Sequence, residues 1–467
     1  SAQMMRNFYN VRNNQYAWFT SSGLTEQGRG LWSLKNMQPS NQSKKDDNGL
    51  KQRMDSLLQN DSVAININDS SVAQTELSLT RTFVDLANTN QDIVNRNNIY
   101  YMVPVKKQDP VQLADSILHK QTDTAQYAKN KGYSALKQQL SIYYEVAKNG
   151  GWQPIPSGSI RKGSKSPAVS ALKKRLQATQ DYPAGDTSSV YSDSLVTVVK
   201  DVQQRYGLKA TGEVNDSLIQ ALNVPVQERI QQILVNMNRM EWMPMANDSS
   251  RIIVNIPSQM LYTYEGNSKV MEMPVIVGKE GAATLTFSGN INQVIFNPTW
   301  HLPTSIVKNE IMPKMKTDPG YLQKHHMEVT NQSDSVPTIK QLPGKDNALG
   351  RVKFVFPNTY DIYLHDTPDK SLFNRNDRAL SHGCIRVAHA DSLASYLLRN
   401  QQDWNTQKIE SAMKSTQEQI IPVSKPELVQ ITYYTAWVDE NGKMNFRQDI
   451  YNHDKEAASK MFIMRSA

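Results

Sequence analysis

The residues best suited to chemistry lie in one segment, 363–398, which holds the only cysteine of the chain and three of its eight histidines. A thiol is a nucleophile only as thiolate, so it needs a base or a positive local field and a partly exposed position on a turn. The run Ser381-His382-Gly383-Cys384 predicts such a turn, because Gly383 lets successive backbone N–H groups face one side. Those N–H groups can stabilise an oxyanion. We therefore predict Cys384 as a nucleophile.

The base predicted for this thiol is His365. It follows a strand-like run, residues 361–364, and 15 residues separate it from Ser381. Two neighbouring strands joined by a loop of that length can bring the imidazole beside Cys384. The group that orients the imidazole could be a backbone carbonyl or a side chain, and although Asp366 is close in sequence, its direction stays open.

The composition bounds the classes of protein to which the chain could belong. With 467 residues, 39% of them hydrophobic, it is long enough for two to four domains, and its formal charge of +8 favours anionic surfaces. Nucleic acid is the weakest candidate partner, because no dense Lys/Arg block with interleaved aromatics is present. The sequence contains no run of about 18 apolar residues, the length that would predict a membrane-spanning helix. The start at Ser1 indicates a trimmed chain that could have lost a secretion signal or membrane anchor.

The periodicity predicts a multi-domain α+β protein. Helical apolar spacing over 1–157 indicates a mainly helical scaffold domain, and a small three-helix module is expected over 158–224. Residues 225–249 predict a bridging helix that returns to the scaffold. Short β-branched and aromatic runs predict a mostly β catalytic domain over 250–422, interrupted by a charged helical cap at about 303–350. The tail, 423–467, predicts a strand pair around an Asn-Gly turn that completes the sheet.

The small module resembles the three-helix peptidoglycan-binding family. Val202 replaces the usual aromatic residue and Thr211 the usual Asp, so we expect the fold to be kept more readily than the binding. The seven positions that carry the likeness are Gln203, Gly207, Leu208, Gly212, Val214, Leu222 and Asn223. A spacer without glycan affinity is weighed equally.

The catalytic segment resembles the L,D-transpeptidase (YkuD-type) family, whose pattern is a His, 14 to 17 residues, and then Ser/Thr-His-Gly-Cys. The likeness extends to FNPTWHLPTSIVKNEI, PGKDNALGRVKFVFPN and TAWVD, which look like a large periplasmic subgroup with scaffold, binding module and cap. Two local departures are the run 284–287, where the family tends to show a Pro, and His301. The resemblance implies a YkuD-like β-sandwich.

It also implies acyl transfer between peptidoglycan stem peptides. Cys384 would attack the bond before the terminal D-Ala of a donor tetrapeptide, and an amine of an acceptor stem would resolve the thioester into a 3-to-3 cross-link. By resemblance, Arg386 holds the catalytic loop or meets a substrate carboxylate, Tyr363 lines the cleft, and the backbone N–H groups of His382, Gly383 and Cys384 form the oxyanion site. No cofactor or metal is expected, carbapenem β-lactams should acylate the thiol, and the location is the periplasm or cell envelope.

Three alternatives remain open at this stage. Water as acceptor would make the enzyme an L,D-carboxypeptidase, and a protein acceptor would make it a wall-attachment enzyme. A wall-binding scaffold with a vestigial site is the non-enzyme alternative. Several side chains have plainer explanations than a role at the site: His382 as a loop-fixing residue, His325, His326 and His389 as surface histidines, and Trp300, Tyr321 and Trp437 as core more often than groove.

Overall fold

The computed structural model divides the chain into two compact units, which are described separately below. The helical unit comprises residues 1–247 and 433–467, and the sheet unit comprises residues 248–432. The described residues are 2–37, 49–59, 69–89, 99–119, 130–158, 160–243, 250–331 and 335–463. The predicted end of the bridging segment at residue 249 lies outside them.

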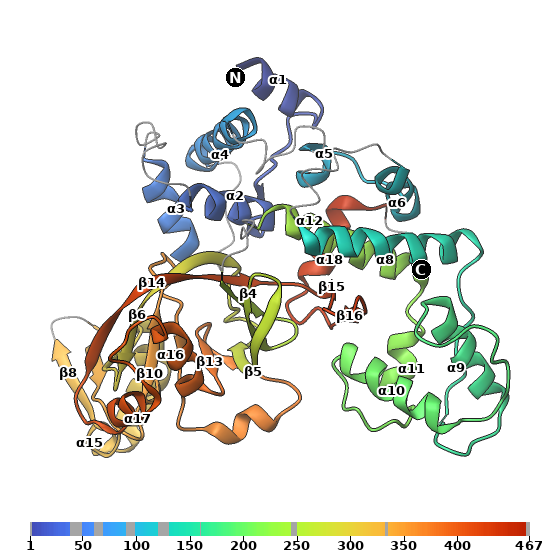
Figure 1. The fold of residues 1–467 in the computed structure, drawn as a ribbon. Helices are drawn as coiled ribbons and strands as arrows, with labels where there is room; N and C mark the ends of the chain where they lie inside the picture. The colour runs from blue at the N-terminus through green and yellow to red at the C-terminus, as the bar shows by residue number, and fades with distance from the viewer. Residues whose placement is uncertain are drawn as a thin grey trace. The chain divides into compact units, whose positions relative to one another are not determined.

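The sheet unit is built on nine strands in the order β12-β5-β13-β11-β10-β6-β14-β3-β4. Figure 1 labels β4, β5, β6, β10, β13 and β14 among them. Because β4 also pairs with β5, the sheet closes on itself and encloses a core of alternate apolar residues. The strands are β3 Arg251–Asn255, β4 Met260–Glu265, β5 Ser268–Gly278, β6 Phe287–Phe296, β10 Val352–Val355, β11 Leu364–His365, β12 Ala379–Ser381, β13 Ile385–Val387 and β14 Gln419–Thr432.

Three helices lie in sequence between strands of this sheet. Leu393, Leu397 and Leu398 are buried on the face of α16 that packs toward β14 and β10. The helices are the 3₁₀-helix η4 Lys370–Asn374, α16 Ala390–Leu398 and α17 Thr406–Lys414.

The insertion predicted as a helical cap has a small core of its own. Leu302, Val307, Ile311 and Ile339 are buried together in it. Beside its helices the insertion contains a three-stranded sheet in the order β7-β9-β8, which the charged sequence did not predict. Its elements are β7 Trp300–His301, α13 Thr304–Ile306, the π-helical turn η3 Val307–Ile311, α14 Met312–Thr317, α15 Tyr321–Lys324, β8 Met327–Asn331 and β9 Thr338–Gln341.

The helical unit begins with an aromatic cluster. The rings of Phe8, Trp18, Phe83 and Trp242 lie with centroids 5.4–6.1 Å apart. Besides the two-residue strands β1 Phe19–Thr20 and β2 Gly23–Leu24, its first part contains the helices α1 Ala2–Asn10, α2 Glu26–Asn36, α3 Leu50–Gln59, α4 Ser70–Thr89, α5 Ile99–Met102, α6 Pro110–His119 and α8 Lys131–Lys148.

The module of three short helices follows, and its core explains the residues that carried the resemblance. Gln203 is buried, and its amide accepts from the Gly212 N–H at 2.8 Å and donates to the Glu213 carbonyl at 2.8 Å. The Asn223 side chain bonds the backbone of Ile155 from both ends of its amide. These residues therefore hold turns of the fold. The helices are α9 Pro167–Ala178, α10 Asp193–Arg205 and α11 Asp216–Leu222.

The tail corrects the prediction that a C-terminal strand pair completes the large sheet. Only residues up to Thr432, the end of β14, pair in that sheet. Beyond it, β15 Ala436–Val438 and β16 Met444–Phe446 form a separate two-stranded sheet, followed by α18 His453–Met461, all in the helical unit. The reason is that Phe446 and Met461 are buried among helices of that unit, and the buried Arg205 donates to the Met444 carbonyl at 2.7 Å.

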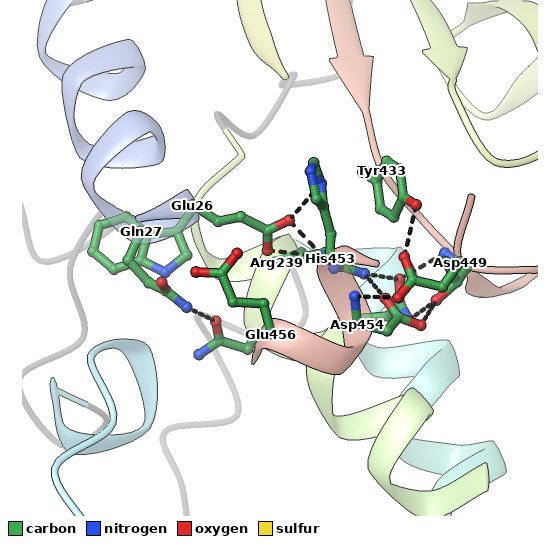
Figure 2. A network of polar contacts seen from close by, with 12 residues as sticks. Glu26, Gln27, Arg239, Tyr433, Asp449, His453, Asp454 and Glu456 are labelled. Atoms are coloured by element: carbon green, nitrogen blue, oxygen red, sulfur yellow. Dashed lines mark hydrogen bonds and ion pairs between the residues drawn. The ribbon is translucent and has the colours of Figure 1, made fainter. Parts of the chain in front are cut away.

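A polar network joins three distant segments of the helical unit (Figure 2). Arg239, near the end of α12 Val226–Glu241, donates to Glu26 of α2 and to Asp454 of α18. His453 lies 3.2 Å from the same Glu26 carboxylate. Burial by itself would raise the pKa of Glu26, but the charges of Arg239 and His453 outweigh it and hold that pKa below its usual range. The carboxylate is therefore ionised and committed to this pairing.

Candidate active site

One parallel strand pair presents the predicted catalytic side chains together. In the β11–β13 register, Leu364 lies beside Ile385 and His365 beside Arg386. Leu364 and Ile385 are fully buried in the core. Since side chains alternate between the two faces of a strand, Tyr363, His365, Cys384 and Arg386 share the opposite face. The core pattern of these strands thus determines where the chemistry lies.

The Cys384 sulfur lies among groups of Asp361, Tyr363 and Lys353. The thiol donates to the Asp361 carbonyl oxygen at 3.7 Å. Burial raises the pKa of the Cys384 thiol, and the backbone and hydroxyl groups of Tyr363 and the positive charge of Lys353 offset only part of that effect. At neutral pH the resting group is a thiol that needs a base.

His365 is buried in the form that a base requires. Its Nδ1 lies 2.6 Å from the backbone carbonyl oxygen of Asp366, and because a carbonyl only accepts, Nδ1 carries the proton and Nε2 keeps its lone pair. Burial, followed by the positive charges of Arg386 and Lys353, lowers the pKa of His365 to about 3. The imidazole is therefore neutral at physiological pH.

The orienting group left open by the sequence is thus a backbone carbonyl. The carboxylate of Asp366 is used elsewhere, since it accepts from the Arg351 N–H at 2.8 Å and from Lys370. No hydrogen bond joins His365 to Cys384 within the described ranges. Catalytic hydrogen bonds often form only in the substrate complex, so this geometry is compatible with a base that closes on the thiol when substrate binds.

The turn before Cys384 is fastened by its own serine. Ser381 is buried, its hydroxyl donates to the Cys384 carbonyl, and its oxygen accepts from the Gly383 N–H at 3.2 Å. The Gly383 N–H is therefore engaged within the turn, in contrast to the expectation that it faces an oxyanion. For the backbone N–H groups of His382 and Cys384, no hydrogen bond is found with any described residue, and these two can serve as oxyanion donors.

Thr284 fixes the same turn from a neighbouring strand connection, and sequence reasoning saw it only as a departure from the family. Its hydroxyl donates to the Gly383 carbonyl at 2.8 Å and accepts from the Gly278 N–H at 2.8 Å. The side chain is fully buried. Gly383 has φ of +112°, so the turn depends on such contacts to keep its conformation.

Replacing Thr284 with Val is expected to loosen the turn. Val keeps the shape but removes two hydrogen bonds from buried backbone groups, which should cost about 1–3 kcal/mol of stability. Urea unfolding would measure that loss, and iodoacetamide alkylation of Cys384 would show altered reactivity. Thr284→Ser keeps the hydroxyl and is the matched control. Equal stability of the Val and Ser variants would contradict this role.

His382 makes a contact that fits its predicted role in fixing a loop. Its Nε2 lies 2.7 Å from the Glu310 carboxylate, on the π-helical turn η3 of the insertion. Trp300, expected in the core, is half-buried and packs against the insertion core. Tyr321 packs against the same small core, whereas Trp437 lies in the helical unit. His325, His326 and His389 are exposed.

The residue that sequence reasoning missed altogether is Lys353. In the β10–β11 register it lies opposite His365, and its ammonium lies 3.8 Å from the centroid of the Tyr363 ring. The available signal was its place between the buried Val352 and Phe354, which directs it to the face of the catalytic side chains.

Two searches of the described residues bear on cofactors and membranes. They contain no group of three or more His, Cys, Asp or Glu arranged to hold a metal ion. None of their helices is both long and apolar enough to cross a bilayer.

Comparison with known families gives three matches along the chain. Residues 249–403 match the model of the L,D-transpeptidase catalytic domain, and residues 3–140 match that of a scaffold domain. Residues 165–222 match the family described as "Putative peptidoglycan binding domain". A relative from Haemophilus influenzae, described as "Putative L,D-transpeptidase", is 34% identical over 242 residues, 48% of either chain. The chain thus matches about half the length of that curated relative.

The solved structures that this chain matches share little sequence identity with it, and their TM-scores are low. An L,D-transpeptidase from Stackebrandtia nassauensis is 15% identical, with 59% of this chain and 96% of that chain covered and a TM-score of 0.23. L,D-transpeptidase 3 from Mycobacterium tuberculosis, solved with a faropenem-derived adduct, is 10% identical, with 39% and 60% covered and a TM-score of 0.21.

Proposed function

We propose that this chain cross-links peptidoglycan stem peptides by acyl transfer through Cys384. Its residues 249–403 match the model of the L,D-transpeptidase catalytic domain. The observation that carries the proposal is the shared face of Tyr363, His365, Cys384 and Arg386 on the β11–β13 pair. A neutral imidazole on the same face as a half-buried thiol is suited to take the thiol proton as the sulfur attacks a carbonyl.

The first half-reaction forms a thioester and releases D-Ala. The Cys384 sulfur attacks the carbonyl between the third residue of a donor tetrapeptide and its terminal D-Ala, while His365 Nε2 takes the thiol proton. The oxyanion receives hydrogen bonds from the backbone N–H groups of His382 and Cys384. As the C–N bond breaks, His365 gives its proton to the departing D-Ala nitrogen, and the imidazole is neutral again.

The second half-reaction transfers the acyl group to an amine. The side-chain amine of the third residue on a neighbouring stem attacks the thioester, and His365 accepts a proton from the attacking nitrogen. The C–S bond breaks, the thiolate regains that proton, and a 3-to-3 cross-link remains. Such a substrate places the enzyme outside the cytoplasmic membrane, in the periplasm or cell envelope. Carbapenems, as mimics of the acyl donor, are expected to acylate the same thiol.

The module matched at 165–222 gives this proposal a second support. A domain of a peptidoglycan-binding family on the same chain would raise the local concentration of wall polymer near the catalytic domain. Two of its positions depart from the usual pattern, Val202 and Thr211, and the Thr211 hydroxyl accepts from the buried Gln203 amide at 3.2 Å. We propose that this module keeps its fold. Its affinity for glycan is not part of this proposal and has to be measured by itself.

Mass spectrometry of the products from purified disaccharide-tetrapeptide tests the proposal. Wild-type chain should yield dimers joined between two third-position residues, together with free D-Ala, and Cys384→Ala should yield neither. Tripeptide without dimer would make the enzyme an L,D-carboxypeptidase. No change that depends on Cys384 would overturn the enzyme proposal on this substrate and favour a wall-binding scaffold.

A further inference from the structure

Two cations share the face of the nucleophile without a carboxylate in contact. Lys353 is half-buried, and Arg386, on the adjoining strand pair, is half-buried as well. Neither forms an ion pair within 4.0 Å with any residue that the structure describes. The Arg386 Nε is buried and has no hydrogen-bond partner among those residues. Both cations therefore retain most of their capacity to bind an anion.

The surroundings compensate these charges only in part. The Lys353 ammonium lies 3.8 Å from the centroid of the Tyr363 ring, a cation–π contact that does not neutralise its charge. Asp361 and Glu418 act on Lys353, and Asp369 on Arg386, only as longer-range charges. Burying a cation without a contacting partner is unfavourable, so a protein keeps one in a reactive cleft chiefly where a ligand supplies the anion.

We propose that Lys353, together with Arg386, binds the terminal carboxylate of the donor stem peptide. The inference rests on the proposed function, because that carboxylate belongs to the D-Ala that departs. It is separated from the scissile carbonyl carbon only by the leaving nitrogen and one α-carbon, so a grip on it fixes the position of the bond that Cys384 attacks. Lys353 thereby selects donors that end at this residue.

Binding of the carboxylate has a consequence for the base. Arg386 and Lys353 are the charges that, after burial, hold the pKa of His365 low. A bound carboxylate would neutralise them and make the imidazole a stronger base only when a donor is in place. The other titratable groups near the imidazole do not supply such a charge, since Tyr363 and Cys384 are neutral at rest and the Asp366 carboxylate is paired with Lys370.

The test compares a donor disaccharide-tetrapeptide with its C-terminal carboxamide. The rate of thioester formation on Cys384 would be followed by intact-protein mass spectrometry for wild type, Lys353→Met, Lys353→Arg and the surface control Lys414→Met. Wild type should prefer the carboxylate donor by about 10- to 100-fold, the range given by a hydrogen bond to a charged group. Lys353→Met should lose most of that preference because the carboxylate donor slows much more than the carboxamide donor, while Lys353→Arg and Lys414→Met keep the preference.

The contrary outcomes are distinct from one another. Equal slowing of both donors in Lys353→Met, with a raised pH midpoint for iodoacetamide alkylation of Cys384, would mean that the lysine acts only on the thiol and would overturn the carboxylate proposal. A wild type that acylates equally fast with both donors would overturn the carboxylate proposal as well. No thioester from either donor in wild type would overturn the proposed function itself, and this inference with it. Lys353→Gln, a polar neutral variant, serves if the Met variant does not fold.

Discussion

Replacing His365 with Asn is expected to slow thioester formation on Cys384 by about 10²- to 10⁴-fold, the usual contribution of a general base. Asn can still donate to the Asp366 carbonyl from the place of Nδ1, which lies 2.6 Å from that oxygen, but it has no counterpart of Nε2. The variant therefore separates the orienting hydrogen bond from the base. Rapid-quench mass spectrometry with the tetrapeptide donor would measure the rate.

The control for this prediction is His365→Gln, which reaches the place of Nε2 but is not a base. Both variants should fold, and both should still be alkylated at Cys384 by iodoacetamide, because the thiol itself is intact. A rate within about threefold of wild type in His365→Asn would show that another group takes the proton, contrary to a general-base contribution.

The pKa of His365 determines how kcat/KM should depend on pH. Because the pKa of His365 is lowered to about 3, the free enzyme keeps its neutral base throughout the neutral and mildly acidic range. The kcat/KM of wild type should therefore not fall with a midpoint near pH 6.5, where an ordinary histidine titrates.

Stability should follow the same shift. The folded state binds a proton at His365 less readily than the unfolded chain does. The contribution of the neutral buried ring to the free energy of unfolding is therefore complete above about pH 6.5 and decreases as the pH falls toward 3. The decrease is at most about 1.4 kcal/mol per pH unit. The difference in unfolding free energy between wild type and His365→Asn should shrink accordingly in acid.

The sequence could predict the central part of this site because chemistry and strand pattern coincide there. The lone Cys384 and His365 flank apolar residues, Leu364 and Ile385, whose burial fixes the face on which the catalytic side chains lie. Helical periodicity likewise predicted the helices of the module, since their apolar residues are spaced at three and four and are buried together.

Other parts of the site depend on strand pairings that a single sequence does not encode. Lys353 enters only because β10 pairs with β11, and Thr284 only because its connection returns beneath the Gly383 turn. The contact of Glu310 with His382 depends on the insertion, because the small core of the insertion holds the turn η3 that carries Glu310. The tail was wrongly assigned to the large sheet for the same reason, since strand propensity does not specify the partner of a strand.

Arg239 is the residue whose loss should most destabilise the helical unit. It is only 8% exposed and holds two carboxylates, Glu26 and Asp454, that come from opposite ends of the chain (Figure 2). Replacing it with Met removes the cation but leaves both carboxylates in place. Breaking a buried pair from one side typically costs about 3–5 kcal/mol, because the remaining charge is uncompensated.

Urea unfolding of Arg239→Met should show that loss in the transition of the helical unit, while the sheet unit, with its own core, unfolds as in wild type. Lys460→Met is the matched control, because Lys460 pairs with Glu456 one helical turn away on the partly exposed face of α18, where such a pair contributes about 0.3–0.5 kcal/mol. Adding Glu26→Gln and Asp454→Asn to Arg239→Met should restore part of the stability, since neutral amides remove the unpaired charges. If the triple variant is less stable than Arg239→Met alone, the two carboxylates contribute by hydrogen bonds to other partners, such as Thr435 and His453, more than by their charge opposite Arg239.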